Sequence, residues 1–131
     1  MKYIKTYEKL NESDRFIKAA RIGYLDIVKE LLNQGIDVNI KNKFGTTALI
    51  YASYNGHLDI VKELLKRSDI DVNIKNKFGT ALIYASINGH LDIVKELLKR
   101  SDIDLNIKDN DDGKDFFDYL KDKQKEVIIK E

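Results

Sequence analysis

The sequence contains no cysteine, no proline and no tryptophan. Without cysteine, the chain can form no disulfide, no thiolate metal site and no cysteine nucleophile. No stretch approaches the roughly 20 apolar residues that a membrane-spanning helix needs, and the charged first ten residues are unlike a signal peptide. These absences favour a cytoplasmic protein that contacts no membrane, and we expect it to be monomeric.

No sign of charge dominates either, since 23 basic residues face 22 acidic ones, for a formal net charge of +1. A neutral balance supplies no general attraction for nucleic acid. What is present is a globular composition, with 43% hydrophobic residues in 131. A chain of this length can bury one core and fold as one domain.

The dominant feature is an internal repeat. The segment NKFGTTALIYASYNGHLDIVKELLKRSDIDVNIK (residues 42–75) recurs as NKFGTALIYASINGHLDIVKELLKRSDIDLNIK (residues 76–108). A weaker copy covers residues 16–41, and a degenerate one covers residues 112–130. Alanines 19, 52 and 85 are spaced 33 residues apart, so one structural unit is repeated along the chain.

Local signals predict two short helices in each unit. Thr47 and Thr80 stand where an N-cap belongs, because a hydroxyl can accept from the free amides of the first turn. Gly56 and Gly89 supply the left-handed residue that ends the first helix. The segment LDIVKELLKR carries one apolar stripe and predicts the second helix. The linker DVNIKNKFG predicts an extended turn or hairpin.

A unit of this length with G-x-T-x-L, then G-H-L-D-I-V-x-x-L-L, then D-V-N resembles the ankyrin repeat. The resemblance covers roughly residues 14–121, although alanine and isoleucine replace the proline and histidine of the family's T-P-L-H-x-A pattern. It implies an all-α solenoid of stacked helix-turn-helix units joined by hairpin loops. We divide this single domain into an N-terminal extension (1–12), a capping repeat (13–41), two internal repeats (42–75 and 76–108) and a truncated capping repeat (109–131).

Few residues suggest chemistry. The only histidines, His57 and His90, recur at the repeat period, and the resemblance implies that they form hydrogen bonds between neighbouring repeats. The turn at residues 109–113 is rich in aspartate, but it places lysine and tyrosine where a calcium loop requires carboxylates. We interpret it as an acidic, solvated turn. We therefore expect no catalytic residue, no metal site and no cofactor.

The resemblance implies that partners bind at the hairpins and at one face of the first helices. Helical geometry supports that face independently, because Tyr51, Tyr54 and Asn55 lie opposite Leu49 and Ala52. Phe44 and Phe78 have an alternative role, packing against adjacent hairpins. The candidate binding residues are Lys41, Lys43, Phe44, Thr46, Tyr51, Tyr54, Asn55, Lys75, Lys77, Phe78, Tyr84, Ile87 and Asn88.

Two functions remain open at this stage. The first is a non-catalytic module that binds a protein or peptide through the concave helix face and the hairpin tips. Its basic hairpins and apolar groove suit a partner segment that is both acidic and apolar. The alternative is binding of nucleic acid or a phosphate ligand through the basic hairpins, which the neutral net charge and the acidic last hairpin disfavour.

Overall fold

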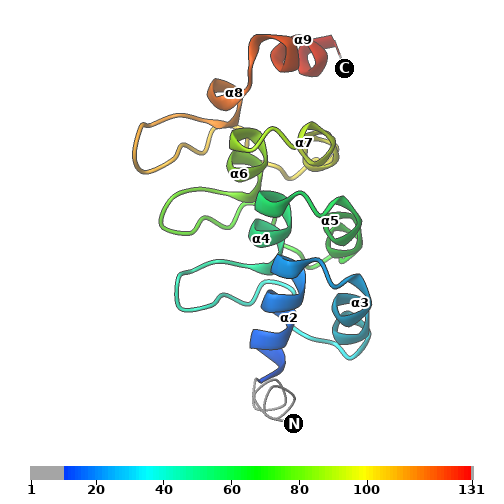
Figure 1. Ribbon diagram of the computed structural model, residues 1–131. Helices are drawn as coiled ribbons and strands as arrows, with labels where there is room; N and C mark the ends of the chain where they lie inside the picture. Colours follow the sequence, from blue (N-terminus) through cyan, green and yellow to red (C-terminus); the bar gives the residue numbers. More distant parts are fainter. Residues whose placement is uncertain (1–10, 131) are drawn as a thin grey trace.

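The computed structural model describes residues 11–130, and in this part of the chain helices follow one another as antiparallel pairs. Figure 1 shows the first helices of the pairs in one column and the second helices in another. The inner column comprises α2 (Glu12–Ile22), α4 (Ala48–Asn55), α6 (Ala81–Ile87) and α8 (Phe116–Tyr119). The outer column comprises α3 (Leu25–Asn33), α5 (Leu58–Leu65) and α7 (Leu91–Leu98), and α9 (Asp122–Lys130) ends the chain. The predicted all-α solenoid is confirmed.

The inner helices begin at side-chain caps. Thr47 Oγ1 accepts from Ile50 N at 3.2 Å, and Thr80 Oγ1 accepts from Ile83 N at 3.3 Å. Glycine in the left-handed region follows the ends of α4 and α6, with φ of 80° at Gly56 and 70° at Gly89. Both predictions from the repeat are thus confirmed, and the polar ends of these short helices are satisfied locally.

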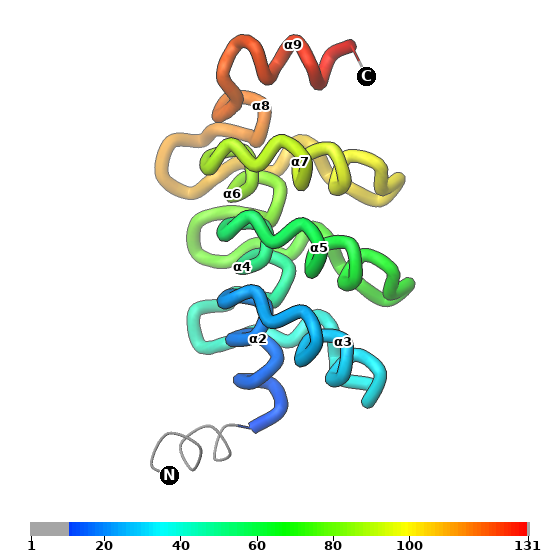
Figure 2. Tube along the Cα trace, turned by 45° about the vertical axis from the view of Figure 1, so that its right-hand side comes forward, coloured from blue at the N-terminus to red at the C-terminus, as the bar shows by residue number. Residues whose placement is uncertain are grey.

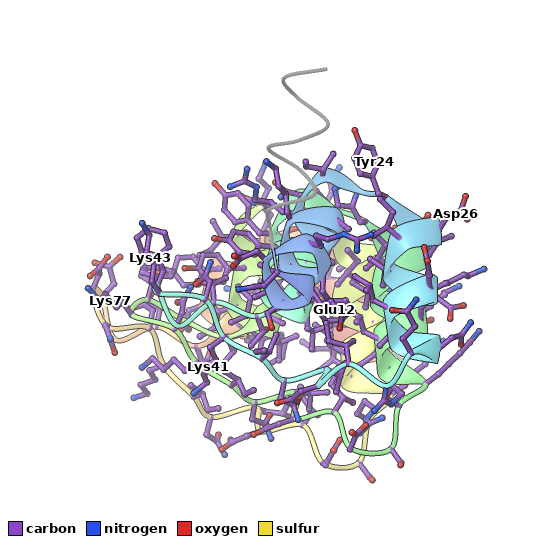
Figure 3. All side chains as sticks on the ribbon, turned by 90° about the horizontal axis from the view of Figure 1, so that it is seen from below. Glu12, Tyr24, Asp26, Lys41, Lys43 and Lys77 are labelled. Carbon is purple, nitrogen blue, oxygen red and sulfur yellow. The ribbon has the colours of Figure 1, made fainter. Side chains whose placement is uncertain are left out.

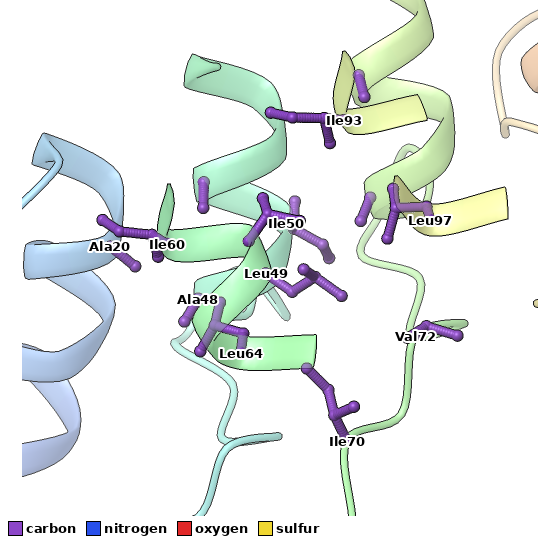
Figure 4. Packing of buried hydrophobic residues seen from close by; sticks show 14 of the residues in the cluster. Ala20, Ala48, Leu49, Ile50, Ile60, Leu64, Ile70, Val72, Ile93 and Leu97 are labelled. Carbon is purple, nitrogen blue, oxygen red and sulfur yellow. The ribbon is translucent and has the colours of Figure 1, made fainter. Parts of the chain in front are cut away.

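The core lies between the two columns of helices and continues from one repeat into the next. Each inner helix packs on the next one, α2 on α4, α4 on α6 and α6 on α8. Ile50 of α4 and Leu64 of α5 both belong to this core, which Figure 4 shows from close by. Ala52 and Ala85 are fully buried, because a small side chain lets the inner helices approach closely. Each repeat therefore depends on its neighbours for burial.

Hairpin loops join the helix pairs and project from one side of the stack (Figures 1 and 2). They contain little regular strand, since the bridge between Lys75 and Thr80 is the pairing found in the described residues. The side chain of Asn42 holds the first loop by accepting from the amides of Phe44 and Thr46 at 2.9 and 3.0 Å. Asn76 holds the second loop in the same way.

The two ends of the stack differ from its middle. At the C-terminal end, Phe116 and Leu120 are buried, and Phe117 and Tyr119 are partly buried against the core. At the N-terminal end, the basic side chains of Lys18 and Arg21 are exposed on one face of α2. The first ten residues of the predicted N-terminal extension lie outside the described part of the chain. No helix of residues 11–130 is long and apolar enough to cross a membrane.

Candidate functional site

Two adjoining pockets lie between successive inner helices, at the roots of the hairpins, and we call this surface with the hairpins beside it the groove. Its helical wall exposes one face of α4 and α6. Tyr54 is 45% exposed and Ile87 is 38% exposed, whereas Leu49 and Ala52 on the opposite face are buried. The sequence predicted one face of α4 in the core and the opposite face free, and the burial of its residues agrees with this division.

Aromatic rings line the centre of this groove. Tyr54 and Tyr84 meet edge to face, with ring centroids 5.5 Å apart at an interplanar angle of 81°. The hydroxyl of Tyr84 donates to Asn76 Oδ1 at 3.1 Å, and the Tyr51 hydroxyl accepts from Asn42 Nδ2 at the same distance. Edge-to-face contacts and hydroxyl bonds orient the rings before any partner arrives, which lowers the entropic cost of binding.

The two hairpin phenylalanines, which stand in identical NKFG motifs, occupy different positions. Phe78 packs against Tyr84, with ring centroids 5.5 Å apart. Phe44 is instead 55% exposed, and the Lys43 ammonium lies 5.1 Å from its ring centroid. The first hairpin contains one more residue, Thr46, and Gly45 there has a φ of 73°. Of the two roles considered for these residues, packing fits Phe78, and exposure leaves Phe44 free for contact.

The four predicted lysines are also not equivalent. Lys43 and Lys77 lie at the tips of the hairpins, and Lys41 lies farther back (Figure 3). Lys75 is half-buried, and its ammonium donates to the Lys108 carbonyl of the next hairpin at 2.6 Å. Lys75 thus joins two repeats, and the lysines exposed at the mouth of the groove are Lys43 and Lys77.

Three other predicted residues also contact neighbouring repeats. Thr46 is only 4% exposed, and its hydroxyl accepts from Asn76 Nδ2 at 3.0 Å. Asn55 donates to the Arg21 carbonyl at 3.0 Å, and Asn88 donates to the Tyr54 carbonyl at 2.7 Å. These amides bond the last carbonyls of the preceding inner helix, so they align the groove wall in addition to bordering it.

The histidines connect the repeats in the manner that the resemblance implied. His57 Nε2 lies 3.0 Å from the Arg21 carbonyl, and His90 Nε2 lies 3.1 Å from the Tyr54 carbonyl. Because a carbonyl only accepts, Nε2 carries the hydrogen in both rings. Each ring also lies on the glycine that ends the preceding inner helix, Gly23 or Gly56. The structural role of the histidines is confirmed.

The interpretation of the third hairpin needs one correction. Asp111 and Asp112 are exposed, but Asp109 is only 5% exposed and is not solvated. Asp109 occupies the position of Asn42 and Asn76, and its carboxylate accepts from the amides of Asp112 and Gly113 at 2.7 and 2.9 Å. Its other oxygen accepts from the Tyr119 hydroxyl. Within residues 11–130 no group of three or more histidine, aspartate or glutamate side chains is placed to hold a metal.

Acid should destabilise the third hairpin, which contains Asp109. Burial tends to raise the pKa of Asp109, but the hydrogen bonds from Tyr119 and from backbone amides outweigh it and hold the pKa below its usual range. A carboxyl whose pKa is lower in the folded state stabilises the protein above its unfolded pKa, about 3.9. That stabilisation is lost as the pH falls through the lower folded pKa. Asp109→Asn should keep the neutral-pH fold, because asparagine holds the other two hairpins, and should lose less stability below pH 4.

Urea unfolding of Asp109→Asn and the parent chain, followed by circular dichroism from pH 7 to pH 3, measures this difference. Asp111→Asn, at an exposed position of the same loop, is the matched control. Equal acid sensitivity in the parent chain and in Asp109→Asn would show that Asp109 contributes nothing to it.

Lys18 and Arg21 also belong to the groove wall, although they are not among the candidate binding residues predicted from the sequence. Lys18 and Arg21 lie 33 residues before Tyr51 and Tyr54, and so occupy the same positions in the preceding repeat. The Arg21 guanidinium lies 5.9 Å from the centroid of the Tyr51 ring. The repeat period contains the signal for both, since shifting the candidate residues Tyr51 and Tyr54 back by 33 positions gives Lys18 and Arg21.

Stacked helix pairs with a groove beside projecting hairpins define a helical repeat solenoid. The family model of ankyrin repeats, three copies, matches residues 16–109, and the chain belongs to this family. Ankyrin repeats are generally protein–protein interaction modules. No curated protein matches the sequence.

Proposed function

We propose that this chain is a non-catalytic module that binds a partner protein or peptide in the groove between the inner helices and the hairpin tips. The observation that carries the proposal is the exposed aromatic and aliphatic surface of Tyr54, Tyr84 and Ile87 on a face that the core does not need. Aromatic groups that are rigid before binding are the usual anchors of protein interfaces.

Charge around the groove supports a partner segment that is acidic as well as apolar. Lys43 and Lys77 extend at the hairpin tips, and Arg21 lies at the N-terminal end of the helical wall. In the described part of the chain, no acidic side chain lies within ion-pair distance of these three cations. The ion pairs found there, such as Lys66–Glu63 and Arg100–Asp102, lie on the outer helices and their loops.

The test begins with capture of partners on the immobilised chain, followed by calorimetry with the parent and two groups of variants. Tyr54→Ala and Ile87→Ala should each weaken binding by roughly 1 kcal/mol or more, because they remove apolar anchors. Both side chains are partly exposed, so folding should be little affected. Lys43→Gln with Lys77→Gln should mainly slow association and reduce its salt dependence, as charges at the rim of an interface do.

The opposite pattern would favour the alternative function. A phosphate ligand or nucleic acid would lose binding steeply with salt and with the lysine substitutions, and the Tyr54 and Ile87 substitutions would matter little. Lys29→Gln, on the exposed face of α3, serves as the control because it removes a cation outside the groove.

A further inference from the structure

The groove contains two pockets, one between α2 and α4 and one between α4 and α6. The first has a volume of about 170 Å³, and its walls include Lys18, Arg21 and Tyr51. The second has a volume of about 320 Å³, and its walls include Tyr51, Tyr54 and Tyr84. Tyr51 lines both pockets.

The two pockets are the same pocket built twice in successive repeats. A shift of 33 residues carries Ile17, Lys18 and Arg21 of the first pocket onto Ile50, Tyr51 and Tyr54 of the second. Asn42 corresponds to Asn76 at the root of the next hairpin, one residue later because the loop between them is longer. The backbone is repeated, and the residues that face the groove have changed.

That change gives the pockets different chemistry. The first presents two cations, Lys18 and Arg21, against one carboxylate, Asp14. Neither cation has an acidic side chain within ion-pair distance among the described residues. The second pocket has no charged residue in its lining and is walled by three tyrosine rings. A carboxylate suits the first pocket, and an aromatic or aliphatic side chain suits the second.

The distance between the pockets sets the spacing of the ligand groups. Neighbouring inner helices pack about 8–10 Å apart. A peptide in the polyproline II conformation advances about 3.1 Å per residue and makes one turn every three residues. Equivalent pockets in successive repeats are therefore spanned by about three residues, and side chains three positions apart lie on the same side of such a peptide. We propose that the groove recognises a peptide segment in the polyproline II conformation that places an acidic side chain in the first pocket and an aromatic or aliphatic one, three positions away, in the second. This inference rests on the proposed function and specifies its partner.

Acetylated and amidated tetrapeptides test the motif without a known partner. Glu-Ala-Ala-Phe and Phe-Ala-Ala-Glu present both groups in the two chain directions, and one of the two should give saturable chemical-shift changes at groove residues at low ionic strength. Lys-Ala-Ala-Phe and its reversed sequence replace the acidic side chain with a basic one. Glu-Ala-Ala-Ala and its reversed sequence remove the aromatic ring. The charge reversal should weaken binding about threefold or more, and loss of the ring about tenfold.

Two variants at equivalent repeat positions assign the two groups to their pockets. Arg21→Gln should reduce the preference for glutamate over lysine, because only Lys18 then remains as a cation in the first pocket, and should keep the preference for the ring. Tyr54→Ala should abolish the preference for the ring and keep that for glutamate. Both positions contact the following repeat through backbone carbonyls, so these contacts remain. Lys29→Gln should change neither preference.

Equal binding of the lysine and glutamate peptides, or of peptides with and without the ring, would overturn the two-pocket motif. So would the absence of saturable shifts with every tetrapeptide at millimolar concentration. A captured partner separates this failure from that of the proposed function. If Tyr54→Ala weakens that partner while the tetrapeptides fail, only the motif is wrong. If Tyr54→Ala leaves the partner's affinity unchanged, the groove itself is not the binding site.

Discussion

Ala52→Asp is expected to unfold the chain, or to lower its free energy of unfolding by several kcal/mol. Ala52 has no exposed surface and lies in α4, which packs against both α2 and α6. An aspartate there must either bury an unpaired carboxylate or push the inner helices apart, and burial of an unpaired charge is among the most costly single changes. Each repeat is stabilised by its contacts with neighbouring repeats, so the loss of stability extends beyond the second repeat.

Thermal unfolding followed by far-ultraviolet circular dichroism measures the loss of stability. The loss should reach the several kcal/mol that are typical of damage to a core. Lys62→Asp, which places the same carboxylate on the exposed face of α5, should change stability by less than about 1 kcal/mol. An unchanged melting temperature in Ala52→Asp would show that this position is not buried between the inner helices.

Gly56→Ala should have the next largest effect, at about 2–4 kcal/mol of lost stability, from strain and a lost hydrogen bond. Gly56 has a φ of 80°, and a Cβ on it would lie 2.7 Å from Cε1 of His90. The left-handed conformation alone costs an alanine roughly 1–2 kcal/mol. Displacement of the His90 ring also breaks its bond to the Tyr54 carbonyl, and with it one of the links between the second and third repeats.

Gly89 provides a matched control for this prediction. Its φ of 70° imposes similar strain, but a Cβ there would meet only Gln124 Nε2, at 3.5 Å. Gly89→Ala should therefore cost only the conformational strain. Chemical denaturation of both variants gives the comparison, and equal losses would mean that the close approach of His90 contributes nothing to the requirement for glycine.

Much of the fold could be predicted because its signals are local and repeated. Thr47 and Thr80 cap their helices, and glycine follows each helix, for reasons that involve only a few neighbouring residues. The resemblance to ankyrin repeats implied the contacts of the histidines between repeats, and their recurrence at the period favoured a structural role. The sequence also predicted which face of α4 is free, since one helical turn determines that Tyr54 lies opposite Leu49.

The candidate site was less predictable, because long-range contacts decide which exposed residues are available. Lys75 reaches the Lys108 carbonyl 33 residues away, and Thr46 reaches Asn76. Asp109 looked like one of several solvated acids, yet it is buried and bonded to Tyr119. A local sequence pattern does not show which residues that lie far apart in the chain come into contact.

By itself, the sequence determined the repeat period and the capped helices, because regular helices and their caps depend on interactions within one turn, and the recurrence of similar units indicated that they stack. Only the tertiary structure separated Phe44 from Phe78, although both stand in the same NKFG motif. One extra residue in the first hairpin changes the path of its backbone, and the ring that packs on Tyr84 in one repeat is exposed in the other. Only stacking places Lys18 and Arg21 beside Tyr51, since the groove forms between repeats and not within them.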